Sequence, residues 1–109
     1  MCDVRRDRRE AALQKCNQGC ADRLGQPGYD GVKAYNDFRD VLSREDVHAV
    51  LLALPFPWAA PMAVLAMRAG KDVDGEKPVA ITVREGIVLL ETARRYSRVF
   101  QAGTQQRSV

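Results

Sequence analysis

The chain has 109 residues, of which 46% are hydrophobic and 28% charged, and a formal net charge of +3. This is the size and balance of one ordinary soluble domain with a single modest core. No run approaches the roughly 18 uninterrupted apolar residues of a membrane span, and the start lacks the apolar segment of a secretory signal. We therefore expect a cytoplasmic protein that binds no membrane. Its cysteines, Cys2, Cys16 and Cys20, are sparse and odd in number, which argues against a disulfide framework.

The arginine cluster "RRDRR" at residues 5–9 is the feature that most favours nucleic-acid binding. Acidic residues are interleaved with it, and aromatic residues that could stack on bases make up only 6% of the chain. We expect no nucleic-acid partner, because such mixed charge is typical of the solvated start of a helix.

The first expected element is an amphipathic helix over residues 8–24. Asp7 and Glu10 have the spacing of a capping box at its start. Cys16 and Cys20 fall on its apolar stripe, so we expect them to be buried as small hydrophobic residues rather than to bind a metal.

Shorter elements follow a loop rich in glycine and proline. Residues 33–36 predict a short strand, and residues 36–44 a short helix capped by Asn36. The run "VHAVLLAL", residues 47–54, is apolar nearly throughout, which is typical of a strand covered on both faces in a parallel sheet.

Two helices and two strands are expected in the rest of the chain. Pro61 in the first turn and Gly70 as a stop predict a helix over 61–69. A capping box of Thr82 and Glu85 predicts a second helix over 82–96. Four of its residues are expected to face inward: Val83, Ile87, Leu90 and Ala93. Strands are expected near 72–74 and 98–102.

Strands and helices that alternate in this way predict right-handed parallel crossovers. Ligands of such sheets bind at the carboxyl ends of the strands. Three irregular or polar segments follow strands here, and we expect them to meet at one edge: "LPFPW", "EKP" and "GTQQRS".

An ordered set of motifs covers nearly the whole chain: "CDVRRDRREAA", "WAAPMAVLAMRAGKDV", "EKP", "TVREG", "ETARRY" and "FQAGTQQRS". In this order and spacing they resemble the nucleotide-binding domain of the glucose-fructose oxidoreductase and inositol dehydrogenase family, Gfo/Idh/MocA. The resemblance implies NAD or NADP as cofactor and a small sugar-like substrate in the complete protein. It leaves open whether the protein forms a homo-oligomer.

The resemblance also implies roles for the Glu-Lys-Pro triplet. Lys77 would be the catalytic residue, stabilising or shuttling the proton of a substrate hydroxyl beside the nicotinamide. Glu76 would face the cofactor ribose, and Pro78 would follow a cis peptide bond.

Further cofactor-binding residues are implied at other strand ends. Asp3 matches the acidic residue that accepts hydrogen bonds from the adenosine ribose. Arg5 or Arg6 could instead hold a ribose phosphate, so NAD and NADP are not separated. A last group matches the segment that flanks the cofactor: Leu54, Pro55 and Trp58. No metal site is implied.

The chain departs from the family pattern at two places. Many members read Thr-Pro-Asp-His-Trp-His before "APM", whereas this chain reads "LPFPWA" at residues 54–59. The two residues before the triplet are often Tyr-Cys in the family, and here they are Asp74 and Gly75. Any polar role that these positions have in the family therefore does not carry over to this chain.

The dinucleotide fingerprint G-x-G-x-x-G occurs nowhere in the chain. We therefore expect residues 1–109 to form an incomplete NAD(P)-binding domain without the C-terminal substrate-binding α/β domain. The expected fold is α/β, a partial Rossmann-like three-layer sandwich with parallel strands and helices on both faces, which lacks the first strand and the Gly-rich turn. Losing that central strand would separate residues 2–4 and 33–36 from the later strands.

Two classes of function remain open. The first is the nucleotide-binding portion of an oxidoreductase that acts on a sugar or polyol hydroxyl, although some relatives use the same redox step to cleave glycosides. The second is a non-catalytic remnant or association module that binds no cofactor. We expect this chain by itself to be inactive in either case.

Overall fold

A computed structural model describes residues 1–108 and divides the chain into two compact units, Met1–Arg44 (the first unit) and Glu45–Val109 (the second unit). The division falls between the segments that the loss of a central strand was expected to separate. In the described part of the chain, no helix is long and apolar enough to cross a membrane.

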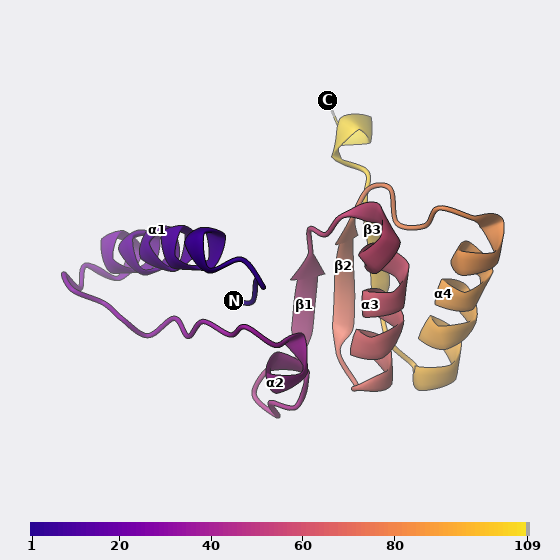
Figure 1. The fold of residues 1–109 in the computed structure, drawn as a ribbon, viewed down its shortest axis with the longest axis horizontal. Coiled ribbons are helices and arrows are strands. Elements are labelled where there is room, and N and C mark those ends of the chain that lie inside the picture. The colour runs from indigo at the N-terminus through magenta and orange to yellow at the C-terminus, as the bar shows by residue number, and fades with distance from the viewer. Residues whose placement is uncertain (109) are drawn as a thin grey trace. The chain divides into compact units, whose positions relative to one another are not determined.

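The second unit is built on a sheet of three parallel strands in the order β1-β2-β3 (Figure 1). The strands are β1 (Ala49–Leu52), β2 (Asp72–Glu76) and β3 (Phe100–Gly103). In the register, Val50 lies beside Val73, and Val73 lies beside Phe100. The predicted parallel pairing is confirmed, with β2 running two residues further than expected.

Helices α3 (Phe56–Arg68) and α4 (Val83–Tyr96) pack against each other, and α3 also packs on β1 and β2. The connections β1-α3-β2 and β2-α4-β3 lead in the same direction across the sheet. Two right-handed connections of this kind place both helices on the same face. Figure 1 shows α4 at the outer edge of this helical layer. The second unit is therefore an α/β arrangement of one parallel sheet and one layer of helices.

The core of the second unit lies between α3, α4 and the sheet. Met67 of α3 is fully buried, and small residues around it let the helix approach its neighbours closely. The other buried hydrophobic residues of this unit are Ala60, Ala63, Ala66, Val73 and Leu89.

The opposite face of the sheet is exposed. Leu51, Asp74 and Gln101 are neighbours in the register and all three are exposed, Leu51 to 70%. The expectation that residues 47–54 are covered on both faces was therefore wrong for this structure, because α3 and α4 occupy only one face.

Helix α3 begins at Phe56, five residues before the predicted start at 61. Pro55 is its cap and Pro57 lies in the first turn, where a missing N–H removes no helical hydrogen bond. Pro61 lies inside the helix. The predicted stop is confirmed, since Gly70 follows the helix with a φ of 80°.

Helix α4 has the predicted capping box. The Glu85 backbone N–H donates to the Thr82 hydroxyl at 3.2 Å, and the Glu85 carboxylate accepts from the Thr82 N–H at 3.4 Å. The same carboxylate accepts from the Ile81 N–H at 2.6 Å. These bonds satisfy donors at the helix start that have no partner within the helix.

The predicted inward face of α4 was wrong. Of the four residues expected to be buried, three are 82% (Val83), 44% (Ile87) and 50% (Leu90) exposed, and the fourth, Ala93, is half-buried. The helix instead buries Leu89 and Thr92, and it packs against α3. The Thr92 hydroxyl donates to the Val88 carbonyl at 2.7 Å, so this polar residue is buried with its hydrogen bond made.

The first unit contains α1 (Arg6–Leu24) and α2 (Phe38–Leu42). In place of the short strand expected at residues 33–36, a single parallel bridge joins Cys2 to Tyr35. The Asp3 N–H donates to the Tyr35 carbonyl at 3.2 Å, which continues this pairing by one bond.

The predicted caps of the first unit were wrong. Asp7 and Glu10 do not cap α1; they bind the guanidinium groups of Arg5 and Arg6 at 2.6 and 2.7 Å. Oppositely charged neighbours on a helix surface compete for the carboxylates that a capping box would need. Asp37, not the predicted Asn36, caps α2 by accepting from the Arg39 N–H at 2.9 Å, and Asn36 accepts from Arg9 instead.

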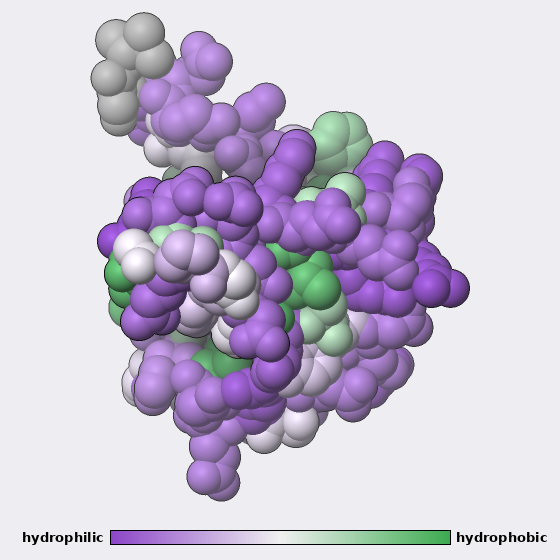
Figure 2. Space-filling view, turned by 90° about the vertical axis from the view of Figure 1, so that its left-hand side faces the viewer, coloured by the Kyte–Doolittle hydropathy of each residue, from purple (hydrophilic) through white to green (hydrophobic). Residues whose placement is uncertain are grey.

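The core of the first unit is thin. Ala21 is its only buried residue. The expected burial of Cys16 was wrong, because this residue is exposed, and Cys20 is half-buried. Figure 2 shows a face on which hydrophilic residues predominate, with small hydrophobic areas between them.

We predict that Met67→Ala lowers the free energy of unfolding of the second unit by about 2–5 kcal/mol, because it leaves a cavity in the core. Leu51→Ala is the control, and its effect should stay within about 0.5 kcal/mol because the side chain is exposed. Urea denaturation followed by the fluorescence of Trp58, the one tryptophan of the chain, measures both. Equal effects of the two substitutions would contradict the position of the core.

We also predict that backbone amides of α1 and α2 exchange hydrogen faster than those of β2 and α3. The first unit buries one residue, so its opening costs less free energy. Hydrogen exchange followed by mass spectrometry measures this difference, and circular dichroism should show a broad melt. Uniform protection with one sharp, cooperative melt would show that the two units unfold together.

Candidate functional site at the carboxyl edge of the sheet

The three strands of the second unit end at the same edge, because they are parallel. Pro55 follows β1, the turn 77–78 follows β2, and Gln105 follows β3. The expectation that the segments after the three strands meet at one edge is confirmed. We refer to this set of strand ends as the carboxyl edge.

The carboxylate of Glu76 links two segments of the carboxyl edge. One oxygen accepts from the Lys77 N–H at 2.9 Å, and the other accepts from the side-chain amide of Gln105 at 3.2 Å. Gln105 was not predicted as a site residue. Its position directly after the last strand was the signal that could have identified it.

Two glycines allow β2 and β3 to lie close together at this edge. A Cβ on Gly103 would lie 3.3 Å from the Glu76 Cα and 3.3 Å from the Gly75 carbonyl oxygen. A Cβ on Gly75 would lie 3.2 Å from the ring of Phe100. Larger residues would push the Glu76 backbone away from β3.

Lys77 is exposed and lies at the end of β2. The Lys77-Pro78 peptide bond is cis, as expected. Within residues 1–108, no hydrogen bond or ion pair holds the Lys77 ammonium, which leaves its three donors open to a ligand oxygen.

Apolar side chains are exposed at the start of α3, the helix that follows β1. Leu54, Phe56 and Trp58 are 37%, 58% and 60% exposed. Pro57 has no N–H, and the Trp58 N–H donates to the Pro55 carbonyl at 3.0 Å. This helix start therefore offers few free donors to a phosphate, and its exposed surface suits a flat, apolar group better.

The remaining predicted site residues belong to the first unit. One Asp3 carboxylate oxygen accepts from the Arg5 N–H at 2.8 Å, which leaves the second oxygen open to a hydroxyl donor. The Arg5 guanidinium binds Asp7 through two hydrogen bonds of 3.1 and 2.6 Å and lowers the pKa of the Asp7 carboxyl. A phosphate at Arg5 would have to replace an exposed ion pair, and such pairs are weak.

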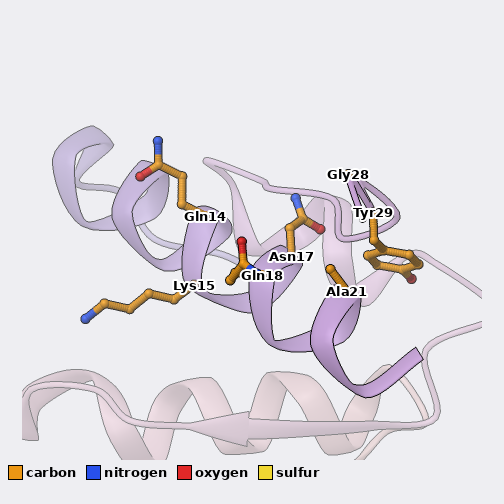
Figure 3. A pocket seen from close by; sticks show the side chains of 7 residues that line it. All are labelled: Gln14, Lys15, Asn17, Gln18, Ala21, Gly28 and Tyr29. Carbon is orange, nitrogen blue, oxygen red and sulfur yellow. The ribbon is translucent and has the colours of Figure 1, made fainter. Parts of the chain in front are cut away.

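The first unit also carries an open groove of about 550 Å³ between α1 and the following loop (Figure 3). Asn17 fixes the loop by accepting from the Val32 N–H at 3.1 Å. Tyr29 lies over Gly31, where any Cβ would collide with its ring. Lys15, the one charged residue among those that line the groove, extends away from Tyr29 in Figure 3.

The parallel sheet, its crossover helices and the polar carboxyl edge define a Rossmann-like α/β fold. The family model described as "Oxidoreductase family, NAD-binding Rossmann fold", Gfo/Idh/MocA, matches residues 6–104. The chain belongs to this family, which confirms the resemblance inferred from its motifs.

Similar proteins agree with this assignment. A glycosyl hydrolase family 109 protein of Shewanella sp. (strain W3-18-1) is 43% identical over 58 residues, which cover 53% of this chain and 13% of that protein. The crystal structure of an NAD-binding protein from Listeria innocua is 32% identical with a TM-score of 0.79, covering 96% of this chain and 26% of that one. A 3-ketoreductase from Actinomadura kijaniata, solved with NADP and TDP-benzene, is 25% identical with a TM-score of 0.68, covering 94% and 27%.

The chain thus spans about an eighth to a quarter of the length of these proteins. The cofactor of the family is a nicotinamide dinucleotide, and the described residues fit it in part. The open oxygen of Asp3 can accept from a hydroxyl, and the exposed Lys77 ammonium can donate to a ligand oxygen. The pyrophosphate has no glycine-rich turn in this sequence to receive it.

We predict that Gly103→Ala destabilises the second unit and frees the Glu76 carboxylate from Gln105, because backbone atoms block the added methyl group. Gly86→Ala in α4 is the matched control. Nothing lies within 4 Å of its added Cβ, so it should stabilise the helix by about 0.5–1 kcal/mol. Thermal melts of both variants test this, and a Gly103→Ala variant as stable as Gly86→Ala would rule out the close contact.

Proposed function

We propose that this chain is the nucleotide-binding portion of a cytoplasmic oxidoreductase that transfers hydride between NAD(P) and a hydroxyl-bearing carbon of a sugar or polyol. The observation that carries the proposal is the carboxyl edge, where an unpaired Lys77 ammonium stands beside a Glu76 carboxylate held by two donors. Membership of an NAD-binding oxidoreductase family supports the reaction type.

Lys77 is the catalytic residue in this proposal. When bound, the nicotinamide supplies the chemistry of accepting or giving a hydride. The Lys77 ammonium donates a hydrogen bond to the reacting oxygen of the substrate, which stabilises negative charge there and moves its proton. Glu76 faces the ribose beside the nicotinamide, and its bond to Gln105 keeps the carboxylate in place.

The other proposed cofactor contacts divide by chemistry. Asp3 accepts from the adenosine ribose hydroxyls, and Arg5 would hold a ribose phosphate if the cofactor is NADP. Apolar surface at the nicotinamide end comes from four residues: Leu54, Pro55, Trp58 and Pro78. The similar proteins from Listeria innocua and Actinomadura kijaniata are named with NAD and NADP respectively, so both cofactors are tested.

A second candidate is a non-catalytic module that binds no cofactor. Two observations favour it: the sequence contains no G-x-G-x-x-G, and the start of α3 presents few free N–H donors. A pyrophosphate without such donors keeps its charge uncompensated. On this reading the chain serves in protein association only.

Calorimetric titration with NAD and NADP separates the two candidates. We expect the 109-residue chain to bind either dinucleotide no more tightly than about 1 mM, and to turn over no sugar or polyol. Fusing a strand, G-x-G-x-x-G turn and helix from the Listeria innocua protein before Met1 should tighten binding at least tenfold. No gain on fusion would favour the non-catalytic module, and micromolar binding by the unfused chain would show that the cofactor lies elsewhere.

Asp3→Ala in the fused protein tests the ribose contact. Its loss should weaken NAD binding by roughly 10–100-fold, the effect of removing a hydrogen bond to a charged group. Asp30→Ala is the control, since Asp30 is an exposed carboxylate in a loop of the same unit. Equal binding by the two variants would remove Asp3 from the site.

A further inference from the structure

The outward face of α4 carries an apolar stripe that the oxidoreductase proposal does not use. Val83, Ile87 and Leu90 follow the i, i+4, i+7 spacing of one helix face and are 82%, 44% and 50% exposed. They lie opposite the face that buries Leu89 and Thr92. Such a continuous row differs from singly scattered apolar residues, which need no partner.

Two charged residues flank this α4 stripe on the same side. Arg84 and Glu91 are seven residues apart, two helical turns, and both are exposed. In the described residues, no hydrogen bond or ion pair holds either side chain. Arg84 lies three residues before Ile87 and Glu91 four residues after it, so their opposite charges make this face complementary to itself in an antiparallel pair.

We propose that α4 is a self-association surface that pairs antiparallel with α4 of a second copy of this chain. A two-fold axis near Ile87 brings each Ile87 against Leu90 of the second copy. The same axis places Arg84 of each copy beside Glu91 of the other, so both ion pairs form at once. This is the reciprocal contact that an isologous interface requires.

The neighbouring groove enlarges this surface. It has a volume of about 260 Å³ and lies between α3 and α4, lined by Ala60, Pro61, Val64, Arg84, Glu85 and Val88. Arg84 belongs to both the groove and the flank of the α4 stripe. The contact is nevertheless one helix wide, below the area of stable dimers, so we expect a dissociation constant on the order of 100 μM.

Sedimentation equilibrium of the 109-residue chain over a range of concentrations tests the proposal. The chain should form dimers that weaken moderately at high salt, and Ile87→Lys should abolish them by placing a charge in the contact. Leu51→Lys, an exposed apolar residue on the open sheet face, is the control and should leave the dimer intact. A wild-type chain that stays monomeric at millimolar concentration overturns the proposal.

A charge exchange tests the antiparallel geometry. Arg84→Glu and Glu91→Arg should each weaken the dimer at least tenfold, because like charges then face each other. The double variant Arg84→Glu/Glu91→Arg should restore association to within about threefold of wild type, as expected for a restored coupled pair. Circular dichroism verifies that every variant folds. Single variants that dimerise normally, or a double variant that does not recover, overturn the proposed pairing.

Discussion

The packing of α3 between the sheet and α4 is the contact on which the rest of the second unit depends. Its buried face consists of alanines and the fully enclosed Met67, so the helix can lie close to β1, β2 and α4 at once. Because α3 and α4 cover the same face, the opposite face of the sheet stays open. The segments after all three strands leave from one edge because the strands are parallel.

The chemistry proposed for the carboxyl edge follows from which of its two charged side chains, Glu76 and Lys77, has hydrogen-bond partners. Glu76 is held by a backbone N–H and by Gln105, whereas the Lys77 ammonium, its neighbour in sequence, has no partner in the described chain. The fixed carboxylate can accept a hydrogen bond from one group of a ligand, and the free ammonium beside it can donate to a ligand oxygen. The two glycines of β2 and β3 make this arrangement possible, because they let the strands approach without side chains between them.

The first unit is organised by charge more than by burial. Its helix start is held by arginine–carboxylate pairs, and Arg9 joins the Asp3 carbonyl to the Asn36 side chain at 2.7 and 2.8 Å. Exposed pairs of this kind contribute little to stability, and one buried alanine adds little more. The position of Asp3 therefore depends on a small set of hydrogen bonds.

By itself, the sequence determined the order and type of the main elements, because hydrophobic periodicity and the signals at residues such as Thr82 and Gly70 act locally. It also determined the family and placed Lys77 at the end of a strand.

The tertiary structure decided which faces are buried. Val83, Ile87 and Leu90 have the periodicity of an inward stripe, yet the residues that α4 buries are Leu89 and Thr92. Periodicity reports that a helix has an apolar face, whereas only the position of its neighbours decides which face they cover. The same holds for Asp7 and Glu10, whose capping spacing gave way to arginines that could reach them, and for Gln105, whose bond to Glu76 joins residues 29 positions apart.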